Sequence, residues 1–150
     1  MDLSQPATDL LEVVSLVIRG VAENRDLSLT AAAALASLDR LGPQRITTLA
    51  ASEGVSQPSM TQLAQRLEQR GLVARTSDPS DGRVALVSLT DQGRAAIAAR
   101  RERNARTIAA LLARLPEDDV RMLAGGLAAV LPAIRERVLS QSKVAAGNPS

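Results

Sequence analysis

Residues 56–90 place a short helix directly before a hairpin, and this order constrains the fold more than any other part of the sequence. Ser56 can cap a helix over residues 57–70, with Pro58 in its first turn, where a missing N–H costs nothing. Gly71 suits the left-handed conformation that ends many helices. The segments "LVARTS" and "RVALVSL" are typical of two β-strands, and the turn "DPSDG" between them predicts a hairpin.

A shorter helix precedes this one, and the two together predict a helix-turn-helix. Thr47 can cap the shorter helix and Gly54 can end it, after an extended piece at residues 45–46. Two helices joined by a tight glycine turn form a helix-turn-helix. A further helix is predicted before them over "TAAAALASLDRL", with Thr30 as its cap and Gly42 at its end.

Amphipathic patterns on both sides of this region predict long helices. The apolar face of an N-terminal helix over residues 8–22 consists of Leu10, Val13, Val14, Val17 and Val21. Asn24 and Asp26 break this helix. After the hairpin, Thr90 can cap a long helix over residues 91–114.

A last helix is predicted over residues 117–139. It follows Pro116 and begins with three acidic residues, which suit the positive end of the helix dipole. Pro132 lies inside this helix and should kink it near Ala128. The tail at 140–150 has no periodicity and is predicted to be disordered.

The composition limits both the core and the chemistry of the protein. Apolar residues make up 45% of the 150 residues, but Phe, Tyr and Trp are absent, so the core is aliphatic and packs most readily as helices on helices. Cys and His are also absent, which excludes disulfides, thiolate or His catalysis, and zinc sites with nitrogen or sulfur ligands. The sequence has no glycine-rich phosphate loop either. We therefore expect neither an enzyme nor a cofactor.

The hydropathy of the chain gives no sign of a membrane segment. No apolar run reaches the roughly 18 to 20 residues that span a bilayer, and the N-terminal segment "MDLSQPATDLLEVV" lacks the basic region of a secretory signal. These features predict a soluble, cytoplasmic protein.

The predicted helix over residues 57–70 has an unusual polar face. Its apolar face consists of Met60, Leu63, Ala64 and Leu67, and its polar face of Pro58, Thr61, Gln62, Gln65 and Gln69. Gln can pair with adenine through two hydrogen bonds, and hydroxyl groups can donate or accept, so this face suits contact with base edges. The alternative is an ordinary polar surface helix.

The segment from Leu49 to Gly93 resembles the MarR family of winged helix-turn-helix transcriptional regulators. The most specific parts of the resemblance are "VSQPSMTQLAQRLEQRGLV", the wing "DPSDGR" and "LTDQG". The order of the flanking elements also matches, with one helix before and two long helices after. The resemblance covers nearly the whole chain up to about Val138.

The resemblance implies a fold that is mainly α with a small β wing. A winged helix-turn-helix DNA-binding region would occupy residues 29–94, between an N-terminal dimerisation helix at 1–28 and C-terminal dimerisation helices at 95–139. The residues expected to form a homodimer interface are Leu10, Val13, Val14, Val17, Leu111, Leu115, Leu127, Leu131, Ile134 and Val138. These apolar faces exceed what one small winged domain can cover. The alternative is that the helices pack only on their own protomer.

The resemblance also implies that the helix after Ser56 enters the major groove of double-stranded DNA. The candidate DNA-binding residues are Ser56, Gln57, Pro58, Ser59, Thr61, Gln62, Gln65, Arg66, Arg75, Asp81 and Arg83. Ser56 and Ser59 lie near the helix N-terminus, where backbone N–H groups favour a phosphate. Gln57, Thr61 and Gln62 are the expected base readers.

Arginines of the hairpin have expected roles as well. The resemblance places Arg83 at the minor groove, where narrow A·T tracts concentrate negative potential. Arg75 is expected on a phosphate, and Thr47 or Thr48 can bind another from the preceding helix. All basic residues except Lys143 are Arg, but codon usage in a GC-rich genome explains much of that bias.

Two acids lie in this arginine-containing hairpin, where they would be expected to repel DNA. Asp78 precedes Pro79 and can accept backbone N–H bonds that fix the turn. Asp81 lies two residues before Arg83, so its carboxylate can hold the Arg83 guanidinium in one orientation before DNA binds. The alternative is two solvated turn acids.

Members of the family commonly respond to small, often anionic or phenolic, ligands between their DNA-binding and dimerisation parts. A cluster of arginines, Arg100, Arg101, Arg103 and Arg106, can attract an anion there or form a solvated helix face. We favour the solvated face and assign no ligand residue. The absence of Cys excludes peroxide sensing through a thiol, and the absence of His and Cys makes the sequence unlike the zinc-sensing branch.

The sequence thus predicts a sequence-specific transcriptional regulator. We expect a homodimeric repressor that binds a pseudo-palindromic operator with half-sites about one helical turn apart and is released by a small-molecule effector. The alternatives are a nonspecific architectural DNA-binding protein and a pure protein-interaction module.

Overall fold

The computed structural model describes residues 1–21 and 26–146 of the 150-residue chain. Its elements in chain order are α1 (Ser4–Val21), α2 (Leu29–Leu41), β1 (Gln44–Arg45), α3 (Ile46–Ser52), α4 (Gln57–Gln69), β2 (Val73–Asp78), β3 (Asp81–Leu89), α5 (Asp91–Leu112) and α6 (Glu117–Ala146). The three strands form one antiparallel sheet in the order β1-β3-β2. The predicted fold class, mainly α with a small β wing, is confirmed.

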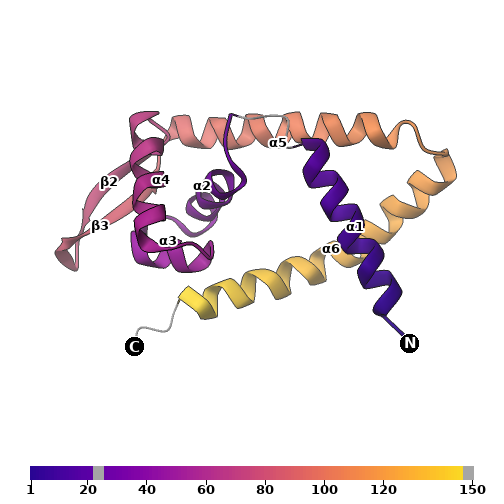
Figure 1. Ribbon diagram of the computed structural model, residues 1–150, viewed down its shortest axis with the longest axis horizontal. Helices are drawn as coiled ribbons and strands as arrows, with labels where there is room; N and C mark the ends of the chain where they lie inside the picture. Colours follow the sequence, from indigo (N-terminus) through magenta and orange to yellow (C-terminus); the bar gives the residue numbers. More distant parts are fainter. Residues whose placement is uncertain (22–25, 147–150) are drawn as a thin grey trace.

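The long helix α5 connects two parts of the molecule (Figure 1). The sheet and helices α2, α3 and α4 gather at its N-terminal end, and the β2–β3 hairpin projects beyond them. Helix α1 packs on α5, and α6 turns back so that its C-terminal part comes close to α3. The predicted boundary at residue 94 falls in the first turn of α5.

The core lies between α2, α3, α4, the sheet and the start of α5. Leu35, Leu49, Met60 and Val87 are its most completely buried large apolar residues. The apolar face predicted for α4 is confirmed, since Met60, Leu63, Ala64 and Leu67 are all buried. The polar face of α4 is therefore fixed outward by the aliphatic core on its other side.

Several predicted helix ends are confirmed. The hydroxyl of Ser56 accepts a hydrogen bond from the backbone N–H of Ser59 at 3.3 Å, and Pro58 lies in the first turn of α4. Thr90 caps α5 in the same way, with 3.0 Å between its hydroxyl and the N–H of Gly93. Gly71 has a φ of 72°, the left-handed conformation that follows the end of α4.

Two predicted caps are wrong. Helix α2 begins at Leu29 and is capped by Ser28, whose hydroxyl accepts the N–H of Ala31 at 3.1 Å, so Thr30 lies inside the helix. Helix α3 begins at Ile46, directly after β1, and no side chain caps it. Thr47 is therefore inside α3. The chain enters this helix from a strand paired with β3, which leaves no separate cap residue.

Helix α6 is longer than predicted. It runs to Ala146, so most of the tail expected to be disordered is helical, and residues 147–150 lie outside the described part. No Gly or Pro interrupts the segment between Pro132 and Gly147, so nothing in it stops the helix. The helix is continuous across Pro132, and the predicted kink stays a prediction. Helix α1 is also longer than expected, since it begins at Ser4, and the predicted break at Asn24 lies outside the described residues.

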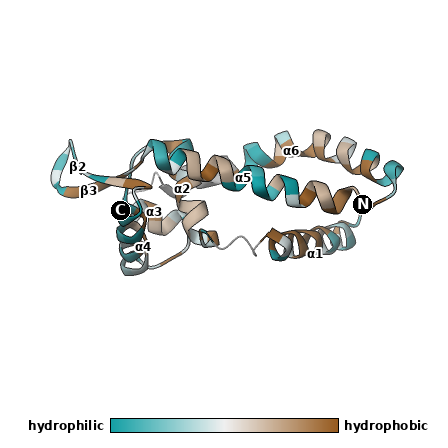
Figure 2. Ribbon diagram, turned by 90° about the horizontal axis from the view of Figure 1, so that it is seen from above, coloured by the Kyte–Doolittle hydropathy of each residue, from teal (hydrophilic) through white to brown (hydrophobic). Residues whose placement is uncertain are grey.

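Large apolar side chains are exposed on α1 and α6. Figure 2 marks the apolar residues of these helices in brown along the ribbon. Of the residues expected at a dimer interface, those exposed in the protomer are Leu10, Val13, Val14, Leu111, Leu115, Leu127, Leu131, Ile134 and Val138. Val17 is half-buried. One protomer alone therefore leaves these faces uncovered. Within the described residues, none of the helices combines the length and the hydrophobicity that crossing a bilayer would require.

Candidate nucleic-acid interface

The outer face of α4 carries uncharged polar side chains at the surface. Gln57, Gln62 and Gln65 are exposed, and their amides form no hydrogen bond with any other described residue. Thr61 is half-buried, and its hydroxyl donates to the carbonyl of Gln57 at 2.9 Å, which leaves its oxygen able to accept. The Ser56 hydroxyl donates to that of Ser59 at 2.8 Å. These side chains can therefore form hydrogen bonds with a bound partner.

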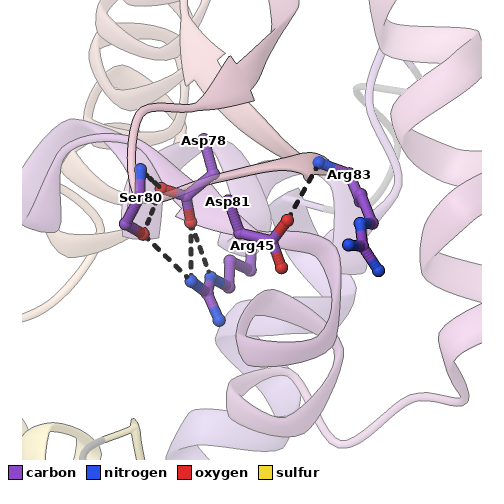
Figure 3. A network of polar contacts seen from close by, with 5 residues as sticks. All are labelled: Arg45, Asp78, Ser80, Asp81 and Arg83. Atoms are coloured by element: carbon purple, nitrogen blue, oxygen red, sulfur yellow. Dashed lines mark hydrogen bonds and ion pairs between the residues drawn. The ribbon is translucent and has the colours of Figure 1, made fainter.

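The hairpin is held at its tip by Asp78 (Figure 3). One carboxylate oxygen, Oδ1, accepts the backbone N–H of Ser80 at 2.9 Å and the Ser80 hydroxyl at 2.7 Å. The other oxygen, Oδ2, accepts Nε of Arg45 at 2.9 Å and Nη2 of Arg45 at 2.7 Å. Hydrogen bonds from Ser80, and then the Arg45 guanidinium, lower the pKa of Asp78 to about 2. The predicted turn-fixing role of Asp78 is confirmed.

Sequence reasoning missed Arg45 as the partner of Asp78. The two residues are 33 positions apart, and no local pattern connects them. They meet because β1 pairs with β3, with Arg45 opposite Leu86. This pairing brings the Arg45 side chain within reach of Asp78 and Ser80 at the hairpin tip.

The expected contact between Asp81 and the Arg83 guanidinium is wrong. The Asp81 carboxylate instead accepts the backbone N–H of Arg83 at 3.1 Å, and no dashed line in Figure 3 reaches the Arg83 guanidinium. Asp side chains commonly bond the backbone two residues ahead at turns, and this local bond takes up the carboxylate. Arg83 is exposed and has no ion pair with any described residue. Its charge therefore faces solvent at the hairpin.

Arg75 is held against α4 by an acid. Its Nε and Nη2 donate to Oε2 of Glu68 at 2.8 Å and 2.7 Å, and this hydrogen bonding lowers the pKa of the Glu68 carboxyl. Both side chains are about one third exposed. The position of the Arg75 guanidinium therefore depends on Glu68 of α4 as well as on β2, which carries Arg75.

A groove of about 400 Å³ separates α4 from the hairpin. It is lined by Arg45, Ile46, Thr47, Gln57, Thr61, Arg75, Arg83, Val84 and Ala85. The groove brings together four of the candidate DNA-binding residues, Gln57, Thr61, Arg75 and Arg83, and adds Arg45 and Thr47. Ser56, Pro58, Ser59, Gln62, Gln65, Arg66 and Asp81 do not line it and are exposed on α4 or on the hairpin. Three arginines and no acidic residue line the groove, so it favours a polyanion.

The arginines of α5 have intramolecular partners. Arg100 is buried and donates from Nη1 to the carbonyl of Leu27 at 3.0 Å, and Arg103 pairs with the carboxylate of Asp26 at 3.0 Å. Arg106 pairs with Glu102, and Arg101 lies 3.7 Å from Asp39. These contacts fit neither a free anion site nor a purely solvated face. Arg100 and Arg103 instead hold the residues directly before α2, Leu27 and Asp26. No group of three or more metal-ligating side chains occurs in the described part of the chain.

The combination of α3, a glycine turn, α4 and a following β2–β3 hairpin defines a winged helix-turn-helix protein. Residues 27–85 match the model of the MarR family. The winged helix-turn-helix region of the chain is therefore similar to MarR-family transcriptional regulators.

Individual relatives agree with this assignment. The chain is 42% identical over 59 residues to the HTH-type transcriptional repressor MdtR of Bacillus subtilis, a match that covers 39% of this chain and 38% of MdtR. The chain spans about two fifths of the length of several curated relatives that it matches. The transcriptional regulator Tm0710 from Thermotoga maritima has a similar structure, with a TM-score of 0.72 and 27% identity over 91% of this chain and 99% of Tm0710.

A further similar structure is a ligand complex. The PcaV transcriptional regulator from Streptomyces coelicolor, solved with its natural ligand, has a TM-score of 0.56 and 25% identity over 89% of this chain and 97% of PcaV.

Proposed function

We propose that the protein is a sequence-specific transcriptional regulator that binds operator DNA as a homodimeric repressor. The observation that carries the proposal is the arginine-lined groove between α4, where Gln57 and Thr61 line it, and the β2–β3 hairpin. MdtR, a relative in this region, is named as a transcriptional repressor. One wall of the groove is α4, which would read the major groove of DNA, and the other is the hairpin, which would reach the minor groove.

Helix α4 is the reading element of the proposal. Its exposed amides at Gln57, Gln62 and Gln65 have no partner among the described residues, so they can pair with base edges without breaking an internal bond. Few charges lie on this face, which favours hydrogen bonding to bases over purely electrostatic contact. The capped N-terminus at Ser56 offers backbone N–H groups to a phosphate.

The hairpin is the second DNA element. Arg83 is exposed near its tip and is not neutralised by a described acid, so its guanidinium can enter the narrow, negative minor groove beside the site read by α4. Asp78 and Asp81 are both bonded to the hairpin itself. The two acids shape the turn that presents Arg83.

The exposed apolar faces of α1 and α6 support a homodimer. Exposed apolar side chains gathered on helix faces in this way commonly mark an interaction surface. A two-fold dimer would place two α4 helices on successive major grooves, which calls for a pseudo-palindromic operator. Light scattering on the purified protein tests this part, and a monomer at micromolar concentration would contradict it.

Small-molecule release of the DNA is also part of the proposal. PcaV was solved with its natural ligand, which supports an effector for the present chain. Such a ligand acts by binding more tightly to a state of the dimer that does not fit DNA. No residue of this chain is assigned to the effector.

A fluorescence anisotropy titration at fixed salt tests the DNA proposal. The probes are the DNA upstream of the protein's own coding sequence and a scrambled duplex of equal length. Arg83→Ala should weaken binding to the specific probe by about 1 to 3 kcal/mol. The matched control is Arg114→Ala, which removes the same charge just beyond the far end of α5 and should bind like the parent protein.

Three outcomes separate the candidate functions. Preference for the upstream DNA over the scrambled duplex supports a sequence-specific regulator. A steep salt dependence without preference would indicate a nonspecific architectural protein. No binding to either probe at low salt would leave only a protein-interaction module.

A further inference from the structure

Arg45 lies between the two elements that are proposed to read DNA. It is the last residue of β1 and directly precedes α3, and its side chain lines the groove between α4 and the hairpin. The side chain is 46% exposed, whereas that of its partner Asp78 is only 9% exposed. The acid therefore lies beneath the guanidinium, and the positive charge faces the groove.

Only two of the three nitrogens of the Arg45 guanidinium bind described residues. Nε and Nη2 donate to Oδ2 of Asp78, and Nη2 lies 3.5 Å from the hydroxyl of Ser80. Nη1 forms no hydrogen bond with any described residue, and Figure 3 shows no dashed line at this nitrogen. A guanidinium carries five N–H groups in a fixed plane, so the bonds to Asp78 also fix the direction of the two on Nη1.

The phosphate backbone of bound DNA must cross this groove. If α4 enters the major groove and Arg83 the adjacent minor groove, the strand that separates the two grooves passes between them. The residues on that path are Arg45, Thr47 and Arg75. Arg75 already shares its charge with Glu68 through Nε and Nη2, so Arg45 and Arg75 would present similarly braced cations to the strand.

We propose that Arg45 is a phosphate-binding residue of the interface, whose Nη1 contacts the DNA strand between the major and minor grooves while Asp78 and Ser80 hold the guanidinium in position. This inference rests on the proposed DNA-binding function and deepens it. It assigns Asp78 a double role, because one carboxylate shapes the hairpin tip and orients the arginine below it. A positioned cation loses less conformational freedom on binding than a free one.

The alternative is that Arg45 only braces the hairpin through Asp78. The two roles differ in how binding depends on salt. Each phosphate contact releases counterions and adds about 0.9 to the slope of log affinity against log salt concentration. A brace changes the affinity without removing a phosphate contact of its own.

The test is the salt dependence of binding to a 24-base-pair duplex of mixed sequence, which needs no knowledge of the operator (its length is chosen at about two helical turns). Arg45→Ala should weaken binding and lower the slope by about 0.9 per protomer. Asp78→Asn should also weaken binding but keep the parent slope, because Arg45 retains its charge. Arg114→Ala serves as the charge-matched control and should change neither quantity.

Each result decides between the two roles. An unchanged slope for Arg45→Ala, or an equal fall in slope for Arg45→Ala and Asp78→Asn, would overturn the direct phosphate contact. If Arg45→Ala does not fold by circular dichroism, Arg45→Gln replaces it, since it retains a polar donor near Asp78 and removes the charge. If the parent protein binds no duplex at low salt, the proposed function itself fails. If the parent binds and Arg45→Gln shows the parent slope, only the role of Arg45 fails.

Discussion

Gly93 is the point at which α5 is fixed to the winged region, and replacing it with Ala should destabilise the protein. Gly93 is buried in the first turn of α5. A Cβ atom there would lie 2.1 Å from the carbonyl oxygen of Leu72 and 2.7 Å from Cδ1 of Leu89. The first of these is a backbone atom that already accepts the N–H of Thr90, so it cannot move aside alone.

The expected cost follows from these contacts. The Cβ would be closer to the Leu72 oxygen than an ordinary van der Waals contact by more than about 1 Å, so the start of α5 must shift. Overpacking of this kind costs about 1 to 3 kcal/mol. The shift also strains the Thr90 hydroxyl, which donates to Gly71 at 2.6 Å and accepts from Gly93 at 3.0 Å, and a weakened cap adds up to about 1 kcal/mol. The better helix propensity of Ala returns up to about 1 kcal/mol, so the net loss should be about 2 kcal/mol.

Thermal unfolding followed by circular dichroism measures this loss. For a chain of this size, about 2 kcal/mol should lower Tm by roughly 4 to 8 °C at equal protein concentration. Gly82→Ala is the control, because nothing lies within 4 Å of its added Cβ in β3, outside the proposed dimer interface. That variant should be as stable as the parent or more stable by up to about 1 kcal/mol. A Gly93→Ala protein that melts at or above the parent temperature would refute the packing argument.

Two further predictions concern base preference and pH. Gln62→Ala should change the consensus that the protein selects from a random pool of duplexes, because an amide that can pair with adenine is lost; an identical consensus would remove Gln62 from the readers. For Asp78, folding lowers the pKa from 3.8 to about 2, so its stabilising contribution is complete above about pH 4 and is lost as the pH falls toward 2. In urea unfolding, Asp78→Asn should therefore be less stable than the parent at neutral pH, with a difference that shrinks below pH 4. A difference that grows as the pH falls would contradict this linkage.

Much of the DNA-binding region could be predicted because its signals are local. The ends of α4 are set by residues in the helix or directly beside it, namely Ser56, Pro58 and Gly71. Its buried face follows from the helical spacing of Met60, Leu63, Ala64 and Leu67. The hairpin follows equally from its turn and its alternating strands. The outward face of α4 could therefore be assigned without any knowledge of distant contacts.

Other details could not be predicted from neighbouring residues. Both Ser28 and Thr30 can cap a helix, and the sequence does not choose between them. In the structure Ser28 is the cap. The residues just before it are held from α5, since Arg100 binds Leu27 and Arg103 binds Asp26, 73 and 77 positions away. The mistaken pairing of Asp81 with the Arg83 guanidinium has a different cause. In the turn, the backbone N–H of Arg83 competes with its guanidinium for the Asp81 carboxylate, and the side-chain pattern does not reveal that competition.

The sequence by itself determined the class of fold, the buried and exposed faces of α4, and the apolar faces left on α1 and α6, because helical and strand periodicity depend on residues a few positions apart. Only the tertiary structure decided what surrounds the proposed site. The pairing of β1 with β3 brings Arg45 to Asp78, and the packing of the hairpin beside α4 brings Arg45 into one groove with Arg75 and Arg83. Such meetings depend on how separate elements pack, and the free energy of that packing is spread over the whole aliphatic core.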